Sequence, residues 1–369
     1  MRKTRVLIVD DSAVIRRLLT DILSADPEVE VLGTAPNAAV AIAKIQQAMP
    51  DVVTLDVEMP EVSGLALLAQ IRKMAPRLPV IMFSSLTQRA ASTTLEALAL
   101  GAADYVTKPT GTGSREASIE QVRAQLLPKI KALGRPAESG AARTNLAGLV
   151  QNPPVTIARR RSQRVDVLTI GCSTGGPNAL AALFRDFPAN FPVPVLIVQH
   201  MPPLFTELLA QRLSATCKPH FHEAREGEEI SAGGVWIAPG DYHMRVVREA
   251  DRLKLTLNRD PPENSCRPSA DVLFRSVAAA YGANTLAVVL TGMGQDGLHG
   301  SEAIAAAGGQ IVVQDEPTSV VWGMPGFVAR AGLAEKILPL GDLAAEIFLR
   351  TRGGRPVNAA ALAERHHVG

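Results

Sequence analysis

The chain is poor in cysteine, in aromatic residues, in net charge and in long apolar runs. Its three cysteines, Cys172, Cys217 and Cys266, are too few and too scattered for a disulfide framework or a cysteine metal site. No apolar stretch reaches the roughly 18–20 residues of a membrane helix, and the apolar run 6–9 is too short for a signal peptide. These absences lead us to expect a cytoplasmic protein with no segment inserted into a membrane.

The charges nearly balance, because 38 basic residues stand against 36 acidic residues and leave a net charge of +2. Such a balance gives no overall reason to expect a nucleic-acid partner. Of the 369 residues, 47% are hydrophobic and 20% are charged, which is enough apolar material for packed cores in two domains. Aromatic residues make up only 4%, and this favours close-packed α/β layers over an all-β sandwich.

An alternation of strands and helices marks the first domain, which we place at residues 1–125. Segments with helical periodicity separate short runs rich in valine, isoleucine and leucine. The strands are predicted at 5–9, 29–34, 51–55, 79–83 and 104–106, and the helices at 14–24, 38–48, 65–74 and 92–100. The alternation predicts a parallel sheet with helices on both faces, and ligands bind such sheets at the carboxyl ends of the strands.

Charged and hydroxyl side chains stand at those strand ends. Asp10 and Asp11 follow the first predicted strand, and Asp56 follows the third. Three carboxylates that converge need either a bound cation or shifted pKa values, and oxygen ligands favour Mg²⁺. Ser84 after the fourth strand and Lys108 after the fifth can hold a phosphoryl group beside the cation. The alternative is that one aspartate caps a helix and the others are solvated loop residues.

Four motifs surround these residues: VDDS (9–12), LDVEMPEVSG (55–64), FSS (83–85) and VTKP (106–109). Through these motifs, the segment resembles the receiver domain of bacterial response regulators, which has a flavodoxin-like fold, over about residues 3–125. The resemblance implies that Asp56 accepts a phosphoryl group from a histidine kinase. It also implies that Asp11 and Asp56 hold Mg²⁺, with support from Asp10.

The same resemblance assigns the neighbouring side chains. Ser84 and Lys108 are expected to contact the phosphoryl oxygens, and Tyr105 is expected to be the aromatic side chain that changes rotamer with them. One departure is Ser63, where receiver domains often carry a second acidic residue before the glycine. It lies away from the expected metal ligands, so it leaves the assignment intact.

The apolar pattern stops after the first domain. Residues 126–163 are rich in proline, glycine, alanine and charge, and we expect a flexible linker there. The run Arg159-Arg160-Arg161 is a candidate nucleic-acid contact. A short basic run in a linker is usually solvated, so we expect no nucleic-acid partner.

A second α/β pattern spans residues 164–350. We expect a mostly parallel α/β domain with an antiparallel hairpin region. Strands are predicted at 165–171, 194–198, 285–290 and 310–314, helices at 177–187, 204–213, 269–281 and 300–307, and hairpin-type strands at 234–238, 244–248 and 252–258. The tail 351–369 is rich in glycine and alanine, and we expect it to be disordered.

Three loops at predicted strand ends carry a serine, a histidine and an aspartate. Ser173 lies in residues 171–175, which fit the G-x-S-x-G turn that exposes a nucleophile. His200 directly follows an apolar strand, and Asp296 lies in the glycine-rich loop 292–297. A parallel sheet gathers such residues into one crevice, where His200 can accept the Ser173 proton and Asp296 can orient the imidazole.

The backbone N–H groups of Thr174 and of Met293 are candidate donors to an oxyanion at this site. The alternative is that Ser173 is a helix N-cap, His200 a core residue and Asp296 a turn former. A glycine-rich turn between strand and helix can also bind phosphate.

The order Ser173, His200, Asp296 along the chain disfavours the common α/β-hydrolase fold, in which the acid lies between serine and histidine. Cys172 precedes the serine on a predicted strand. Its side chain is therefore expected to point the other way, into the core.

Six long blocks stand out in the second half: IGCSTGGP (170–177), VQHMPP (198–203), IAPGDYHM (237–244), RPSADVLFRSVA (267–278), LTGMGQDG (290–297) and VVWGMP (320–325). Through these blocks, the second half closely resembles the catalytic domain of the chemotaxis protein-glutamate methylesterases over about residues 164–350. With the receiver-like segment in front, the domain order is also that of this family.

The resemblance implies hydrolysis of γ-glutamyl methyl esters on the cytoplasmic helices of chemoreceptors, with release of methanol, and deamidation of particular receptor glutamines. Ser173 is then the nucleophile, His200 the base and Asp296 its orienter, with no cofactor for ester hydrolysis. We expect a chemotaxis histidine kinase to phosphorylate Asp56 and so to uncover the serine site. Two other interpretations stay open: a transcriptional regulator with a helix-turn-helix after the linker, and an adaptor that binds receptors without catalysis.

Overall fold

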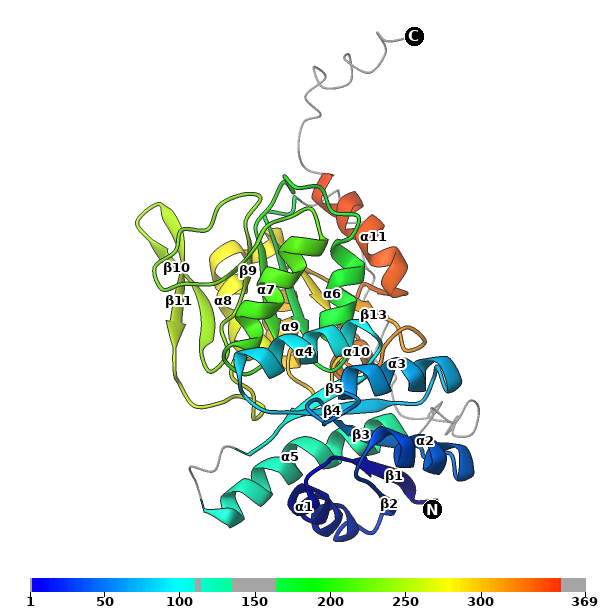
Figure 1. Ribbon diagram of the computed structural model, residues 1–369. Coiled ribbons are helices and arrows are strands. Elements are labelled where there is room, and N and C mark those ends of the chain that lie inside the picture. Colours follow the sequence, from blue (N-terminus) through cyan, green and yellow to red (C-terminus); the bar gives the residue numbers. More distant parts are fainter. Residues whose placement is uncertain (1, 110–113, 135–163, 353–369) are drawn as a thin grey trace, which may run out of the picture.

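The computed structural model describes residues 2–109, 114–134 and 164–352, which form two α/β domains packed on one another (Figure 1). Residues 135–163 of the expected linker, with the run Arg159-Arg160-Arg161, and the tail residues 353–369 lie outside the described residues. Within the described part of the chain, no helix combines the length and the apolar character that crossing a membrane requires.

The first domain is built on a five-stranded sheet in the order β2-β1-β3-β4-β5, in which all neighbouring strands are parallel. Its strands are β1 (Thr4–Val9), β2 (Val29–Ala35), β3 (Val52–Asp56), β4 (Val80–Ser84) and β5 (Asp104–Thr107). Each lies within a residue of its predicted position. This order is that of flavodoxin-like folds, which confirms the predicted fold of the first domain.

Helices cover both faces of this sheet (Figure 1). They are α1 (Ala13–Ser24), α2 (Ala38–Gln47), α3 (Gly64–Met74), α4 (Gln88–Ala99) and α5 (Arg115–Gly134). Polar side chains start the first four, since Ser12, Asn37, Ser63 and Thr87 each accept a hydrogen bond from a backbone N–H of the first turn. Ser63, the departure from the receiver pattern, is therefore the N-cap of α3.

The last helix of the first domain corrects a predicted boundary. Helix α5 continues to Gly134, whereas the sequence placed the start of the linker at residue 126. Leu126 and Ile130 are completely buried in the cluster formed with β1 and β3. Residues 126–134 therefore belong to the first domain. The part of the expected linker that is rich in proline, glycine and alanine begins after them.

The second domain contains a seven-stranded parallel sheet in the order β14-β13-β12-β6-β7-β9-β8. Its strands are β6 (Val167–Cys172), β7 (Val195–Gln199), β8 (Phe221–Glu223), β9 (Val235–Ile237), β12 (Thr285–Val289), β13 (Gln310–Gln314) and β14 (Lys336–Leu338). An antiparallel hairpin of β10 (His243–Glu249) and β11 (Arg252–Asn258) lies beside it. The predicted mostly parallel fold with a hairpin region is confirmed.

Two details of this sheet differ from the prediction. The segment 234–238, expected as a hairpin-type strand, contributes β9, which pairs in parallel with β7 and β8 and is completely covered. The edge strand β14 was not predicted, because three residues carry no readable periodicity.

The strand order reverses at β6, which has β7 on one side and β12 on the other. Such a switch point leaves a crevice at the carboxyl ends of the strands, where ligands bind. The helices that pack on the sheet are α6 (Gly176–Phe184), α7 (Phe205–Thr216), α8 (Ala270–Tyr281), α9 (Leu298–Ala306), α10 (Met324–Arg330) and α11 (Leu340–Arg352).

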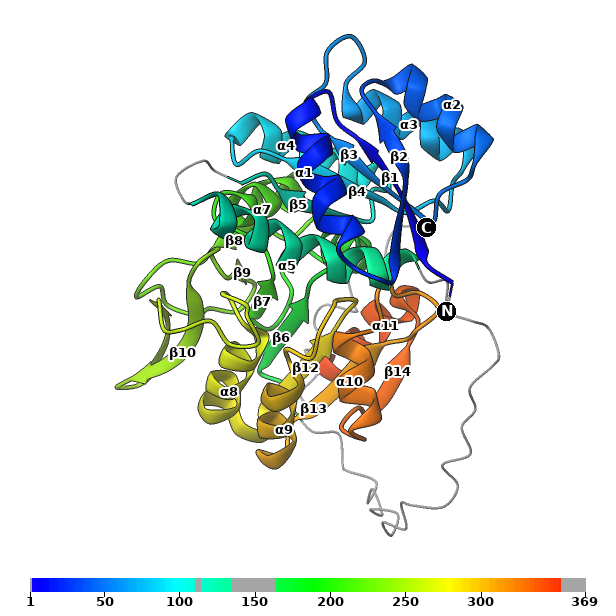
Figure 2. The same ribbon diagram turned by 90° about the horizontal axis from the view of Figure 1, so that it is seen from below.

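The two domains meet through β5 and α4 of the first and through α6 and α7 of the second. Helix α4 lies across α6 and α7 (Figure 1), and the view from below shows β5 beside α7 (Figure 2). The ring of Tyr105 stacks on that of Phe205 with centroids 4.7 Å apart. The Asn178 amide donates to the carbonyl of Leu98 at 2.6 Å. The contact therefore combines ring stacking with a part-buried hydrogen bond.

Candidate functional site

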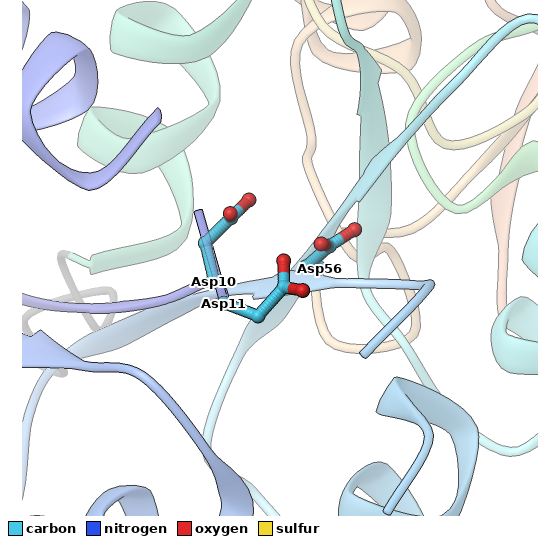
Figure 3. Close-up of side chains that lie close together, drawn as sticks. All are labelled: Asp10, Asp11 and Asp56. Atoms are coloured by element: carbon cyan, nitrogen blue, oxygen red, sulfur yellow. The ribbon is translucent and has the colours of Figure 1, made fainter. Parts of the chain in front are cut away.

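The predicted carboxylate cluster exists at the strand ends of the first domain. Asp10 and Asp11 directly follow β1 and Asp56 ends β3, and each offers a carboxylate oxygen within 4.8 Å of the others. Figure 3 shows the three side chains gathered at this edge of the sheet. Asp10 and Asp56 are buried, whereas Asp11 is exposed.

The electrostatics of this cluster fit a bound cation. Burial, together with the charge of Asp56, raises the pKa of Asp10 to about 6. Lys108 Nζ lies 2.8 Å from Asp56 Oδ1 and 3.5 Å from Asp10 Oδ2. Asp56 Oδ2 is buried and has no hydrogen-bond partner within the described residues. Asp10 Oδ2 is a second buried oxygen of this kind, and a set of carboxylate oxygens with two such atoms matches the ligand preference of Mg²⁺.

Two side chains assigned to this site lie differently. Ser84 is completely buried, and its hydroxyl contacts the hydroxyl of Thr94 at 2.8 Å and the carbonyl of Ala90 at 3.4 Å, both in α4. Tyr105 is buried against Phe205 of the second domain rather than beside the aspartates. The structure thus brings Asp10, Asp11, Asp56 and Lys108 together, while Ser84 and Tyr105 connect that edge to α4 and to the second domain.

In the second domain, Ser173 stands at the sharp turn from β6 to α6. Gly175 has a φ of +79°, a conformation that favours glycine, and Gly176 starts the helix where an added Cβ would lie 1.9 Å from Gln199 Oε1. These two glycines let the chain turn tightly after the serine, which is half-buried. Cys172 is completely buried with Sγ 3.1 Å from Gln199 Oε1, which confirms that it points into the core.

His200 comes next to Ser173 because β6 and β7 are neighbours. Cys172 pairs with Gln199 in the sheet, and the amide of His200 donates to the carbonyl of Cys172 at 3.1 Å. Ser173 directly follows β6 and His200 directly follows β7, and neighbouring strands run about 4.8 Å apart. The imidazole Nε2 lies 2.7 Å from Asp296 Oδ2, and Nδ1 lies 3.5 Å from the thiol of Cys266.

Asp296 is anchored at the start of α8. Its carboxylate accepts hydrogen bonds from the backbone N–H groups of Ala270 at 2.6 Å and Asp271 at 3.1 Å, and from the Ser269 hydroxyl at 2.7 Å. Burial alone would raise the pKa of Asp296, but its bond to His200 and these donors hold that pKa well below the usual range. The carboxylate is therefore a fixed anion beside the imidazole.

The glycine loop places a backbone donor beside the serine. An added Cβ on Gly292 would lie 3.0 Å from Ser173 Cβ and 2.4 Å from Met324 Sδ, so only glycine lets the loop approach this closely. The N–H groups of Thr174 and Met293 have no acceptor within the part of the chain that the structure describes. Two free donors beside a half-buried serine can stabilise an oxyanion.

The Ser173 hydroxyl forms no hydrogen bond to His200 in this arrangement, because both ring nitrogens have other partners. Burial disfavours the imidazolium, but the contacts with Cys266 and Asp296 outweigh it and raise the pKa of His200 to about 10. A general base has to be neutral. His200 therefore has to lose its second ring proton, and the serine or the ring has to reorient, before His200 can accept the Ser173 proton.

Sequence reasoning missed three residues of this site. Asn264, Cys266 and Ser269 precede α8 and contact Asp296 or His200, the first with its amide 3.1 Å from Asp296 Oδ1. Ser269 reads as an N-cap, yet it makes no cap bond and donates to Asp296 instead. No local pattern indicates these roles, since each depends on where the loop of Asp296 folds.

The first domain touches this site directly. The hydroxyl of Thr174, beside the serine, donates to Asp104 Oδ2 of β5 at 2.5 Å. Lys129 of α5 lies 2.8 Å from the same oxygen, so the carboxylate links both domains. Asp104 is 6% exposed, which makes this a buried charged contact.

The fold and the two sites define a two-domain protein in which a five-stranded receiver-like sheet carries a carboxylate cluster and a parallel α/β domain carries a serine beside a hydrogen-bonded histidine and aspartate. Residues 6–120 match the family model of the response regulator receiver domain, and residues 168–347 match that of the CheB methylesterase. A protein-glutamate methylesterase/protein-glutamine glutaminase of Trichodesmium erythraeum is 52% identical over 356 residues, which are 95% of this chain and 99% of that protein. The chain belongs to the CheB methylesterase family.

A second curated relative agrees with this membership. A protein of the same name from Nocardioides sp. is 49% identical over 365 residues, 97% of this chain and 99% of its own length. The crystal structure of the CheB methylesterase catalytic domain of Thermotoga maritima is 38% identical, with a TM-score of 0.49, and covers 50% of this chain and 98% of that one. The predicted family is confirmed, and with it a hydrolase that carries a response regulator receiver domain. The interpretation as a transcriptional regulator is wrong.

Proposed function

We propose that this chain is a phosphorylation-activated protein-glutamate methylesterase and protein-glutamine glutaminase. The names of its relatives supply the two activities. The substrates in this proposal are glutamate γ-methyl esters and particular glutamines on the cytoplasmic helices of chemoreceptors, and the products are methanol and ammonia. Such a substrate places the enzyme in the cytoplasm, where a chemotaxis histidine kinase is its phosphodonor.

In the proposed reaction Ser173 Oγ attacks the ester carbonyl while His200 takes its proton. Asp296 holds the imidazole through Nε2 and stabilises its positive charge. The carbonyl oxygen becomes an oxyanion, which the N–H groups of Thr174 and Met293 stabilise. His200 then gives the proton to the leaving methanol, and water cleaves the acyl-serine to release glutamate.

The observation that carries the proposal is the 2.7 Å contact between His200 and Asp296. His200 follows the strand adjacent to the one that Ser173 follows, so the contact lies beside the serine. It supplies an oriented imidazole where a serine hydroxyl can reach it. Methanol release from a methylated chemoreceptor by the purified full-length protein tests the proposal. A protein that binds the receptor but releases neither methanol nor ammonia is an adaptor, and would contradict it.

The first domain is the proposed phosphoryl acceptor. An Asp56 carboxylate oxygen attacks the phosphorus of the phosphohistidine, and the phosphorus–nitrogen bond breaks. Asp10, Asp11 and Asp56 would hold Mg²⁺, whose charge offsets the repulsion between phosphoryl group and carboxylates. Lys108, now 2.8 Å from Asp56, is placed to contact the phosphoryl oxygens instead.

Strand β5 connects the two sites in this proposal. Lys108 directly follows its carboxyl end, while Asp104 and Tyr105 at its other end contact Thr174 and Phe205. A shift of Lys108 from the carboxylates to the phosphoryl group would displace β5 and weaken these contacts. The docked first domain restricts access to Ser173, and phosphorylation releases that restriction.

Replacing Asp104 with alanine is expected to raise the methanol release of the unphosphorylated enzyme about tenfold. The substitution removes the acceptor of the Thr174 hydroxyl and the partner of Lys129. A hydrogen bond to a charged group contributes about 1.5–3 kcal/mol to stability. Its loss should therefore lower the equilibrium constant for packing of the first domain on the second by roughly a factor of ten or more. Initial rates without phosphodonor measure the effect.

Asp26→Ala is the matched control. Asp26 forms an ion pair of 2.8 Å with Lys131, which like Lys129 lies in α5, and both partners belong to the first domain. Its loss should leave the unphosphorylated rate unchanged. An Asp104→Ala enzyme with the wild-type rate would show that this contact does not restrain the serine site.

A further inference from the structure

The thiol of Cys266 faces the catalytic imidazole from the side opposite Asp296. Its Sγ lies 3.5 Å from His200 Nδ1, while Nε2 lies 2.7 Å from Asp296 Oδ2. The three side chains thus form a row of thiol, imidazole and carboxylate. In such a row the imidazole can take the thiol proton, because the carboxylate stabilises the resulting imidazolium.

A tight turn fixes the thiol in this position. Glu263 and Cys266 pair across it, with backbone hydrogen bonds of 3.1 Å and 2.9 Å in the two directions. The two residues between them, Asn264 and Ser265, have φ values of 52° and 61°, in the left-handed region. Asn264 is also tied to Asp296 and Asp271 by its side-chain amide. The thiol is therefore held against His200 by the backbone itself.

The other two cysteines lack this environment. Cys172 is completely buried, and burial raises the pKa of its thiol. Cys217 is half-buried, burial raises its pKa as well, and its polar neighbours are the Thr216 hydroxyl and the Ala181 carbonyl. Cys266 is the half-buried cysteine that faces an imidazole. It combines access for a small reagent with a proton acceptor.

We propose that Cys266 is a nucleophilic thiol and a site of covalent modification by small electrophiles of the peroxide class, and that its modification switches the esterase off. The site is given by the row Cys266, His200 and Asp296. That the modification stops hydrolysis rests on the proposed function, because the loss concerns the base that serves Ser173. The reactivity of the thiol does not rest on it.

The chemistry balances with hydrogen peroxide as the oxidant. His200 Nδ1 takes the thiol proton, and the thiolate sulfur attacks one peroxide oxygen. The oxygen–oxygen bond breaks, a sulfur–oxygen bond forms, and the second oxygen leaves as hydroxide, which takes the proton from His200 to give water. The sulfur is oxidised by two electrons to a sulfenic acid, which a dithiol reduces back to the thiol.

The test compares alkylation rates of the three cysteines in the intact, unphosphorylated protein at pH 7. Iodoacetamide is the probe, and peptide mass spectrometry measures each site. An ordinary thiol is only about 3% ionised at this pH, so we expect Cys266 to react about tenfold faster than Cys217. Cys172 should stay unlabelled. In His200→Gln, the rate at Cys266 should fall to about that of Cys217, with Cys217 itself unchanged.

The result that overturns the proposal is a Cys266 that reacts no faster than Cys217 in the wild-type protein. This comparison needs no variant, so it decides the point even if His200→Gln unfolds and exposes Cys172. A rate at Cys266 that is unaffected in a folded His200→Gln protein also overturns it.

Hydrogen peroxide supplies the second arm. Methanol release should fall in proportion to oxidised Cys266 and return after dithiothreitol. Oxidation of Cys266 without loss of release would contradict the switch. An enzyme that never releases methanol, yet labels rapidly at Cys266, would refute the proposed function and leave the reactive thiol standing.

Discussion

Methanol release from a methylated receptor should fall about 10⁴-fold or more when Ser173 is replaced by alanine. The substitution removes the oxygen that forms the acyl intermediate, while the oxyanion donors and the substrate contacts remain. Serine hydrolases that lose their nucleophile keep only the small rate acceleration that the oxyanion donors and the substrate contacts supply. Single-turnover measurement of methanol with saturating receptor separates this loss in kcat from a loss of binding.

Ser301→Ala is the matched control for this substitution. Ser301 is also a serine of the second domain, and its buried hydroxyl has no hydrogen-bond partner within the described residues. Removing that hydroxyl should leave the rate unchanged. If Ser173→Ala retained a tenth of the wild-type turnover, another group would have to be the nucleophile, and the proposed reaction would be wrong.

Asp56→Asn should abolish the activation of the enzyme by a small acyl phosphate with Mg²⁺. An asparagine amide cannot accept the phosphoryl group, because its oxygen carries no charge and its nitrogen is not nucleophilic. Without a phosphoryl group to contact, Lys108 should keep its position at the strand ends, and β5 should stay packed against the second domain. The ratio of methanol release with and without phosphodonor should fall to one.

The control for this variant is Asp51→Asn. Asp51 lies at the opposite end of β3, where it pairs with Arg2 and Arg5 and takes no part in the carboxylate cluster. The Asp51→Asn enzyme should keep its activation. Full activation of Asp56→Asn, by contrast, would refute phosphorylation of Asp56 as the trigger.

The positions of these residues could be predicted because parallel sheets collect strand ends. Asp10, Asp11 and Asp56 follow strands that the apolar runs already mark, and the structure gathers them. Ser173 and His200 follow adjacent strands for the same reason. A long, regular apolar run identifies a buried strand. Once the strand is identified, the residue that follows it is known to lie at the carboxyl edge of the parallel sheet.

The remaining features depend on contacts between segments that share no pattern. Asp296 takes the place of an N-cap for α8 although it comes after that helix in the chain. Asp104 looks like an ordinary strand residue, yet its partner Thr174 belongs to the other domain. Cys266 reaches His200 through a turn of two non-glycine residues in the left-handed conformation, which local sequence does not favour. Such contacts are set by tertiary packing, so sequence periodicity could not supply them.

A serine-reactive fluorophosphonate, applied to the full-length protein with and without phosphodonor, tests most directly whether Ser173 is the nucleophile and whether the first domain limits access to it. The account predicts that the label forms at Ser173, slowly in the unphosphorylated protein and faster after addition of acyl phosphate and Mg²⁺. Labelling of a different residue would contradict the serine site. Labelling of Ser173 at one rate under both conditions would contradict its control by the first domain.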